Sequence, residues 1–422
     1  MNKDCRFEYD WIEGVESLEK YRPGGYHPIT IGDTLGGQYC IVDKLGFGGY
    51  STVWLAYNDS SKHYVAIKVG IANSPTIEGR SVRKEAKLLQ ALSKDLPSPL
   101  FVPPILDVFD IQGPNGTHQC YAMIPAQCNL REISSGRLFP LKVSRALSYG
   151  ISLAISHIHS KGYVHGDVHL RNVLLRLDSS LDQFPITKLY EKYGPPETIP
   201  ITRRDRKPLT SHAPAEAVTP ACLGENPENI SLSDVRVLLS DFGEAFKPLS
   251  EVRRGKDCRT PLAMRPPEAR FESEAPLSFS ADIWSLAVAI WEVLGMKAIF
   301  SSEFVTEDDV ASQQIDVLGP MPSKWWERWD ERAQFFDDNG HPKDGRQVWP
   351  PLEESFEEGI QKYRRKWKVG EFDKEETAAI LDLIRRVLTF LPKERLSIEE
   401  VLKSEWMVKW ALPDFESFNI HT

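Results

Sequence analysis

The sequence predicts an α+β fold with two lobes, in which an antiparallel sheet with one helix comes first and a mainly helical lobe follows. Two observations lead to this prediction. Short segments rich in β-branched and aromatic residues, separated by turns, fill the early part of the chain, and segments with helical spacing fill the later part. Strands grouped before helices are typical of an α+β fold rather than of alternating βαβ units.

The first lobe is predicted from three consecutive strand segments, YCIVDKL, STVWLAY and HYVAIKV, which are separated by turn residues. After them, Val82, Ala86 and Leu89 recur at helical spacing and predict an amphipathic helix over 77–92. A further strand pair is expected near 102–124 and completes an antiparallel sheet.

The second lobe is predicted to be mainly helical, and one stretch interrupts it. Residues 177 to about 234 are rich in Pro, Ser, Thr and charged residues and lack periodicity. We expect this insertion to be partly mobile and its residues 180–230 to be dispensable for catalysis. Helices are expected near 141–160, 280–295, 374–390 and 397–408. The expected organisation is an N-terminal extension (1–38), an N-terminal lobe (39–125), a C-terminal lobe (126–412) with the insertion, and a tail (413–422).

The composition excludes several classes of protein. Lys and Arg number 51 against 60 Asp and Glu, so the net charge of −9 provides no overall basic field for nucleic acid or an anionic membrane. No run of about 18 apolar residues predicts a transmembrane helix, and the charged start lacks the apolar core of a signal peptide. Six cysteines without a CxxC pair predict free thiols in a reducing compartment.

A glycine-rich turn, LGFGGYSTV, lies between the first two strand segments. Gly46, Gly48 and Gly49, with Ser51 at the place of a further spaced glycine, allow the backbone to approach a polyphosphate and to point N–H groups at it. By itself the pattern also fits an ordinary hairpin.

Lys68 ends a VAIK segment in the third strand, where its ammonium group can reach the α and β phosphates of a nucleotide. Glu85 lies three residues after Val82, on the inward stripe of the predicted helix, where an unpaired carboxylate would be costly. A pairing of Lys68 with Glu85 explains both residues.

The segment VHGDVHLRNVLL places a carboxylate, Asp167, five residues before an amide, Asn172. This spacing suits phosphoryl transfer, with Asp167 as the base that orients the attacking hydroxyl and Asn172 as a Mg²⁺ ligand. Further on, the apolar strand VLLS ends in DFG, and Asp241 is the second candidate Mg²⁺ ligand.

Taken in this order, the motifs resemble the protein-kinase superfamily from about residue 39 to residue 410. The resemblance adds the PPE and DIWS segments to those above, and it implies a two-lobed protein-kinase-like fold that uses ATP and Mg²⁺. It further implies structural roles for Asp282, which braces the catalytic loop, and for an ion pair of Glu268 with Arg395. The nucleotide-binding residues that it implies, beyond the glycines, Ser51 and Lys68, are Leu45, Val53, Ala66 and Met123.

A finer resemblance is to the SR-protein kinases and their fungal relatives. It rests on the segments YRPGGYHPITIGD, KLGFGGYSTVWLA and TEDDVASQQIDVLG, and on an insertion between the catalytic loop and DFG. It implies a serine/threonine kinase for Arg/Ser-rich proteins that regulate splicing. We expect a monomer in the cytoplasm, the nucleus or both, without direct contact with nucleic acid or membrane.

The catalytic segment departs from the usual pattern at two positions. Gly166 replaces the arginine that binds a phosphorylated activation loop, so we expect an enzyme that is active as made. His169 replaces the lysine that contacts the γ-phosphate, and we favour Arg171, four residues after Asp167, as the compensating cation. HGD followed by Asn also occurs in aminoglycoside and choline kinases, so a small-molecule kinase is one alternative, and a weakly active pseudokinase scaffold is another.

An acidic run, Glu307, Asp308 and Asp309, lies in a segment that resembles the one with which SR-protein kinases hold substrate. Carboxylates there would attract guanidinium groups of an Arg/Ser-rich chain. The other interpretation is a helix N-terminus, because Thr306 followed by acidic residues makes a good cap.

Overall fold

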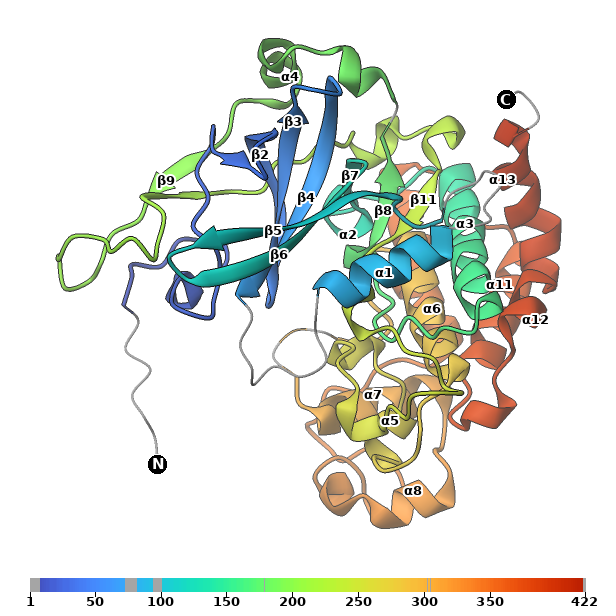
Figure 1. The fold of residues 1–422 in the computed structure, drawn as a ribbon. Coiled ribbons are helices and arrows are strands. Elements are labelled where there is room, and N and C mark those ends of the chain that lie inside the picture. The colour runs from blue at the N-terminus through green and yellow to red at the C-terminus, as the bar shows by residue number, and fades with distance from the viewer. Residues whose placement is uncertain are drawn as a thin grey trace. The chain divides into compact units, whose positions relative to one another are not determined.

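The computed structural model of the 422-residue chain describes residues 8–72, 82–93, 101–177, 179–301, 303 and 305–419. The chain forms two compact units. One unit comprises residues 1–128 and 176–224, and the other comprises residues 129–175 and 225–422. The first contains the predicted antiparallel sheet, and the second is mainly helical, so the predicted fold class is confirmed (Figure 1).

The sheet of the first unit has six strands in the order β1-β2-β3-β4-β6-β5, and neighbouring strands are antiparallel. One face of it buries an apolar cluster that includes Ile41, Trp54, Ile67 and Ala122. The predicted strand segments correspond to β2, β3 and β4, and the later pair to β5 and β6. The bounds are β1 Thr34–Leu35, β2 Tyr39–Gly48, β3 Ser51–Asn58, β4 His63–Ala72, β5 Ile105–Gly113, β6 Gly116–Met123 and β7 Ala126–Asn129.

The predicted amphipathic helix is α1, Val82–Ser93. Ala86 and Leu89 are buried as expected, and Leu92 continues their stripe. The first residues of the predicted range, 77–81, lie outside the described residues.

The insertion is folded over most of its length, contrary to the expectation of a partly mobile segment. It contains α4 (Ile186–Tyr193) and a small hairpin of β9 (Thr198–Pro200) with β10 (Glu216–Val218). Leu181 and Leu189 of the insertion are buried in one cluster with Val42 and Leu55 of the sheet. The insertion is therefore part of the core of the first unit, and the expectation that it is dispensable has no structural support.

The prediction that all cysteines are free thiols is wrong for one pair. Cys128 in β7 and Cys222 near the end of the insertion form a disulfide, with Cα atoms 5.2 Å apart and a sequence separation of 94. Cys40, Cys120 and Cys258 are free, as expected. The disulfide ties the end of the insertion to the chain segment that follows β6.

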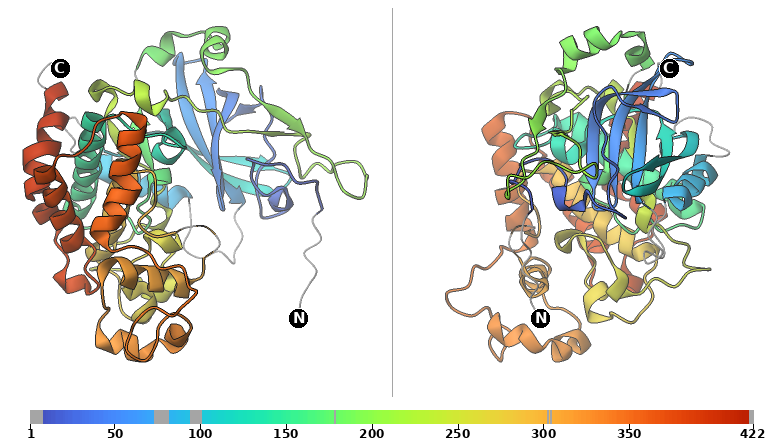
Figure 2. Two further views of the ribbon diagram at one scale, coloured as in Figure 1. Left: turned by 180° about the vertical axis from the view of Figure 1, so that it is seen from behind. Right: turned by 60° about the vertical axis from the view of Figure 1, so that its left-hand side comes forward.

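The second unit is built around α3, with other helices packed beside it, as Figure 2 shows from two further directions. Its two short strands, β8 (Val173–Arg176) and β11 (Val237–Leu239), pair antiparallel. The expected tail from residue 413 is mostly helical, as α13. In the described residues no helix combines the length and the apolar character that a membrane span requires. The helices are α2 Leu130–Ile133, α3 Leu141–Ser160, α5 Glu268–Phe271, α6 Phe279–Leu294, α7 Glu307–Leu318, α8 Ser323–Arg328, α9 Leu352–Phe356, α10 Lys362–Trp367, α11 Lys374–Val387, α12 Ile398–Leu402 and α13 Leu412–Asn419.

Asp43 in β2 yields a prediction about pH and stability. It is only 3% exposed, and burial raises the pKa of its carboxyl group to about 6, although the backbone N–H of Lys44 donates to it. Ionised Asp43 therefore destabilises the fold. This penalty is absent below the pKa of about 3.9 in the unfolded chain and grows until the pH passes the folded-state pKa.

We expect Asp43→Asn to raise Tm by several degrees at pH 7, since it removes a penalty of roughly 1–2 kcal/mol. The gain over the unmodified protein should shrink as the pH falls from 6 to 4. Thermal unfolding across this pH range measures both effects, and Asp59→Asn on the surface serves as the control. A gain that is the same at pH 4 and pH 7 would contradict this account.

Candidate active site

The glycine-rich turn is the hairpin between β2 and β3. Gly48 pairs with Ser51 across the turn, and Gly46 pairs with Val53 two residues further along the strands. Gly48 and Gly49 are exposed, and an added Cβ at Gly46 or Gly48 would meet no atom within 4 Å. Packing therefore does not require glycine at positions 46 and 48. Glycine at these positions is better explained by a ligand that approaches the backbone closely.

Lys68 in β4 and Glu85 in α1 form the predicted ion pair, with the ammonium nitrogen 2.9 Å from the carboxylate. Both residues are buried, at 8% and 5% exposure. In the same strand, Ala66 lies opposite Met123 of β6. The first unit therefore brings Lys68, Glu85, Ala66 and Met123 to one region of its sheet and helix.

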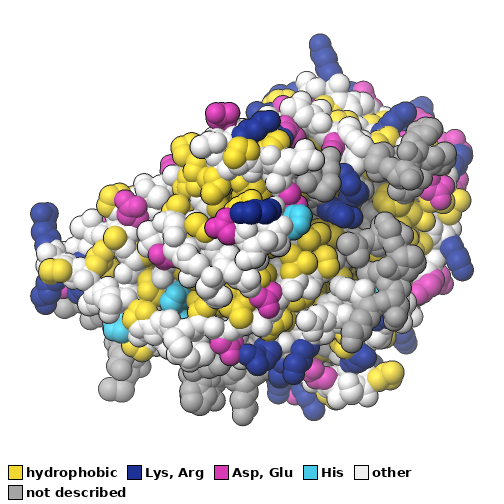
Figure 3. All heavy atoms as spheres, turned by 45° about the horizontal axis from the view of Figure 1, so that its top comes forward, with side chains coloured by type: hydrophobic (Ala, Val, Ile, Leu, Met, Phe, Trp, Pro, Cys, Tyr) yellow, Lys and Arg dark blue, Asp and Glu magenta, His cyan; other side chains and the backbone are white. Residues whose placement is uncertain are grey.

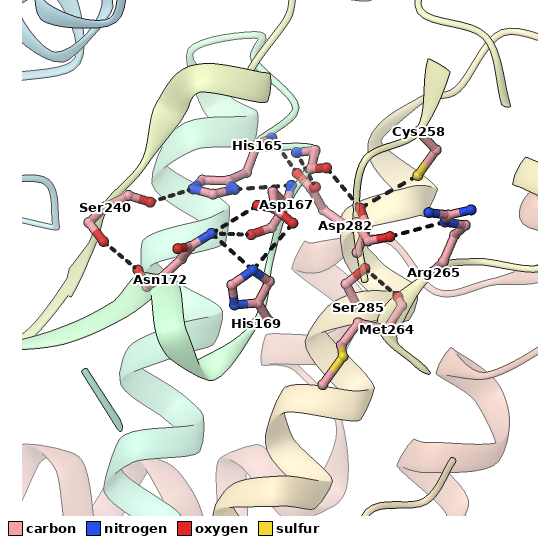
Figure 4. Close-up of polar contacts among 12 residues, drawn as sticks. His165, Asp167, His169, Asn172, Ser240, Cys258, Met264, Arg265, Asp282 and Ser285 are labelled. Atoms are coloured by element: carbon pink, nitrogen blue, oxygen red, sulfur yellow. Dashed lines mark hydrogen bonds and ion pairs between the residues drawn. The ribbon is translucent and has the colours of Figure 1, made fainter. Parts of the chain in front are cut away.

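The catalytic loop of the second unit is held by the carboxylate of Asp282 in α6. It accepts hydrogen bonds from the backbone N–H of His165 at 2.7 Å and of Gly166 at 2.9 Å, and it contacts His159 at 2.9 Å. Burial alone would raise the pKa of Asp282, but these partners hold that pKa below its usual value. The bracing role that the resemblance implied for Asp282 is confirmed (Figure 4).

Asp167, His169 and Asn172 face one another in Figure 4. The Asn172 amide donates to the Asp167 carboxylate at 3.2 Å and to its backbone oxygen at 2.9 Å. His169 Nε2 lies 3.3 Å from Asp167 Oδ1, yet this buried oxygen accepts no hydrogen bond from any described residue. A buried carboxylate oxygen without a donor is costly unless a ligand supplies one. This arrangement suits a group that accepts a hydrogen bond from a substrate hydroxyl.

Arg171 does not join this cluster in the contacts that the structure shows. Arg171 is exposed on the short turn Leu170–Asn172, whereas His169 is buried. The charge of Arg171 acts on Glu292 in α6. Burial raises the pKa of the Glu292 carboxyl group, and the nearby basic side chains, Arg131, His169 and Arg171, offset part of that rise. His169, rather than Arg171, is therefore the basic side chain in contact with Asp167.

Asp241 follows β11 and has a left-handed backbone, with φ 58° and ψ 71°. A non-glycine residue in this region carries strain that the surroundings must hold in place. The preceding residue supplies that support, because Ser240 donates its backbone N–H to Asn172 O at 2.9 Å and its carbonyl contacts His165 Nε2 at 3.1 Å. These bonds tie the DFG segment to the catalytic loop, so Asp241 and Asn172 are positioned by one network.

Gly166 also has a positive φ, of 77°, and a Cβ added there would lie 2.9 Å from the backbone oxygen of Glu244. An arginine at this position would meet both obstacles. Glycine instead of the usual arginine is therefore required by the backbone conformation at position 166. Thr260 donates to the carbonyl oxygen of Gly166 at 2.8 Å, which fastens the same residue from the other side.

The segment after DFG is held by contacts of its own. Arg253 pairs with Glu244 at 2.8 Å, and Phe246 exchanges backbone hydrogen bonds with Val164. At the end of the segment, Glu268 forms the expected buried ion pair with Arg395. The sequence contained no signal for Arg253 or Thr260, since neither belongs to a spaced motif.

The acidic run at the start of α7 forms the cap that one interpretation predicted. Thr306 Oγ1 accepts from the N–H of Asp309 at 3.2 Å, and the Asp309 carboxylate accepts from the N–H of Thr306 at 2.7 Å. Glu307 pairs with Arg265 at 2.8 Å, and Asp308 pairs with Arg270. Internal arginine partners thus already pair with two of the three carboxylates that a basic substrate would use.

Figure 3 shows a face with charges of both signs. Lys and Arg side chains and Asp and Glu side chains both occur there in small scattered groups, with hydrophobic and uncharged areas between them. Among the described side chains on this face, no large area of a single sign stands out.

The comparisons with known proteins agree with this geometry. The family model for the protein kinase domain matches residues 39–190 and 226–407, so the chain belongs to the protein kinase family. The matched ranges include the catalytic loop, DFG and the Glu268 to Arg395 pair, and the small-molecule-kinase alternative thereby loses its support. The crystal structure of the PF14_0431 kinase domain has a TM-score of 0.61 at 16% identity, covering 90% of this chain and 98% of that one.

Within the family, the relatives are serine/threonine kinases of the SRPK type. Serine/threonine-protein kinase SRPK of Physarum polycephalum is 24% identical over 416 residues, covering 93% of this chain and 91% of that protein. Protein kinase dsk1 of Schizosaccharomyces pombe is 25% identical over 504 residues, covering 99% and 90%. SRSF protein kinase 3 of Homo sapiens is 32% identical over 170 residues, 39% of this chain and 30% of that protein. The chain is a serine/threonine protein kinase that resembles SRPK-type enzymes.

We expect Gly166→Ala to lower both stability and kinase activity, because it adds a short contact to an unfavourable φ. Gly162→Ala is a matched control, since Gly162 has φ 79° and an added Cβ there meets nothing within 4 Å. The control should show only the cost of the left-handed backbone, about 1–2 kcal/mol. Thermal unfolding and initial rates measure the difference, and equal losses in the two variants would refute the role of the Glu244 contact.

Proposed function

We propose that this kinase transfers the γ-phosphate of ATP, bound with Mg²⁺, to serine hydroxyl groups in Arg/Ser-rich proteins. Protein kinases in general use ATP and Mg²⁺ on protein substrates. The finer substrate class is suggested by relatives whose names include SRPK and SRSF protein kinase. The observation that carries the proposed chemistry is the buried Asp167 Oδ1, which accepts no hydrogen bond from a described residue.

In this proposal the first unit binds the nucleotide. The glycine hairpin covers the phosphates with backbone N–H groups, and Lys68, aligned by Glu85, contacts the α and β phosphates. Ala66 and Met123 lie opposite each other in β4 and β6 and provide an apolar surface for the adenine, with Leu45 and Val53 from the hairpin.

The second unit supplies the groups for phosphoryl transfer. Asp167 accepts the hydrogen bond of the substrate hydroxyl and orients its oxygen for attack. Asn172 donates its amide N–H groups to Asp167, and no described residue donates to its amide oxygen, so that oxygen fits a hard cation together with the Asp241 carboxylate. Mg²⁺ held there would neutralise charge on the phosphates.

For the side chain that replaces the usual lysine, the contacts favour His169 over Arg171. His169 is buried and in contact with both Asp167 and Asn172, whereas Arg171 is exposed. We therefore propose that the His169 imidazole donates a hydrogen bond to the transferred phosphoryl group.

We further propose that the enzyme acts as a monomer in the cytoplasm or nucleus, without direct contact with nucleic acid. The excess of acidic over basic residues, 60 to 51, favours a basic protein substrate. The run at Glu307 to Asp309 is not assigned to substrate binding, because Arg265 and Arg270 occupy two of its carboxylates. In a compartment that glutathione keeps reducing, the disulfide of Cys128 and Cys222 would be reduced to two adjacent thiols.

The proposal predicts that the purified protein phosphorylates a peptide of Arg-Ser repeats and prefers it to matched peptides with Lys or Ala in place of Arg. Asp167→Asn should lower kcat by at least about 10³-fold, since the oriented hydroxyl is lost, while binding of ATP changes little. Phosphate incorporation and calorimetry measure the two quantities. Turnover by the folded Asp167→Asn protein at the unmodified rate would exclude the mechanism, and no turnover by the unmodified protein would favour the pseudokinase alternative.

The same structure predicts activity without activating phosphorylation, because Gly166 offers no arginine and Arg253 with Glu244 already holds the segment after DFG. Treatment with a phosphatase should leave the rate within about twofold of its starting value. Arg253→Gln should lower the rate severalfold, since it removes this internal pair. A large loss of activity after dephosphorylation, reversed by an upstream kinase, would disprove the prediction.

A further inference from the structure

Two adjacent carbonyl groups at the tip of the glycine hairpin are bound by the segment that precedes the sheet. Tyr26 donates its hydroxyl hydrogen to the carbonyl oxygen of Gly48 at 2.6 Å. Lys20 donates from its ammonium group to the carbonyl oxygen of Gly49 at 2.8 Å. Both donors lie about twenty to thirty residues before the hairpin in sequence, outside the range that the protein kinase model matches.

These two bonds orient the amide groups of the hairpin. A peptide group is planar and trans, so its C=O and N–H point in opposite directions. When the carbonyls of Gly48 and Gly49 point at Tyr26 and Lys20, the N–H groups of the following residues, Gly49 and Tyr50, point to the opposite side. In kinases the glycine-rich loop covers the ATP phosphates, and backbone N–H groups are its donors.

The donors are themselves held firmly. Tyr26 is 2% exposed, and its ring packs edge to face against Tyr21 at 5.5 Å. Tyr21 donates to Glu16, and Glu16 forms a buried ion pair with Lys44 of β2. The Lys20 ammonium also lies 5.6 Å from the centre of the Tyr26 ring. The segment from Glu16 to Tyr26 is therefore anchored to the strand that leads into the hairpin.

The insertion supports the same segment from a different part of the chain. Asn115 donates its side-chain amide to the backbone oxygens of Tyr26, at 2.6 Å, and His212, at 2.8 Å. Tyr21 and Tyr26 are buried in one apolar cluster with Ala213 and Ala217 of the insertion. The insertion, the N-terminal segment and the glycine hairpin are thus joined by consecutive contacts within the first unit.

We propose that residues 16–26 act as a brace that presets the glycine hairpin for the nucleotide phosphates, with Tyr26 and Lys20 as positioning residues. A loop that is already ordered in its binding conformation pays less entropy when the ligand binds. The brace deepens the proposed function, because it rests on the nucleotide being bound there, and it gives the insertion an indirect role in nucleotide affinity.

The test compares a ligand that has phosphates with one that lacks them. Calorimetry with Mg²⁺ and a non-hydrolysable ATP analogue should show about fivefold weaker binding for Tyr26→Phe, and about tenfold weaker binding for Tyr26→Phe with Lys20→Met, as expected for lost hydrogen bonds. Adenosine should bind all variants equally. Hydrogen exchange of residues 46–51 without nucleotide should become faster, and KM for ATP should rise while KM for the peptide stays constant.

Tyr190→Phe is the matched control, because Tyr190 donates its hydroxyl hydrogen to the Val42 carbonyl of the same strand, at 2.9 Å, away from the glycines. It should leave the ratio of the affinities for the ATP analogue and adenosine unchanged. In the double variant, Arg instead of Met at position 20 should bring the affinity for the ATP analogue back nearly to that of Tyr26→Phe alone. If the ratio of the affinities for the ATP analogue and adenosine is unchanged in Tyr26→Phe, the brace is refuted but the nucleotide site is not. Failure of the unmodified protein to bind the ATP analogue would overturn the nucleotide site as well.

Discussion

The catalytic half of this molecule depends on one buried carboxylate. Asp282 is 1% exposed and receives two consecutive backbone N–H groups, from His165 and Gly166. An ionised carboxylate that deep in a protein is tolerated only when donors replace the lost water, and here the donors are the backbone of the catalytic loop itself. The position of Asp167 follows from this, because it is the next residue along the chain. His165 then passes the constraint on to Ser240, and through it to the DFG segment.

Much of the fold and of the site was predictable because local pattern and tertiary structure agree. Val82, Ala86 and Leu89 mark a helix by their spacing, and the same spacing puts Glu85 on the face that meets Lys68. The residues of the catalytic loop and of DFG are recognisable because phosphoryl transfer requires a carboxylate, an amide and a second carboxylate in a short space.

The parts that escaped prediction are those whose order comes from distant partners. Part of the insertion does carry a helical pattern, since Ile186, Leu189 and Tyr190 of α4 are spaced i, i+3 and i+4. Leu181 lies outside that pattern and is buried because Val42 and Leu55 of the sheet receive it. The Cys128 to Cys222 bond could not be inferred from spacing, since the two residues have a sequence separation of 94. The difference between His169 and Arg171 is equally invisible in sequence. Both are basic residues near Asp167 in the chain, and only the turn at Leu170 decides which of them is buried beside it.

Gly166 limits how this enzyme could change over generations. An arginine at that position is the usual means by which a kinase reads a phosphate on its own activation segment, and a single codon change turns some glycine codons into arginine. In this protein such a change would place a side chain at φ 77° and against the Glu244 carbonyl, so the backbone of two segments would have to move first. A phosphate-binding arginine at position 166 is therefore incompatible with the backbone that this loop adopts, unless the segment around Glu244 moves as well.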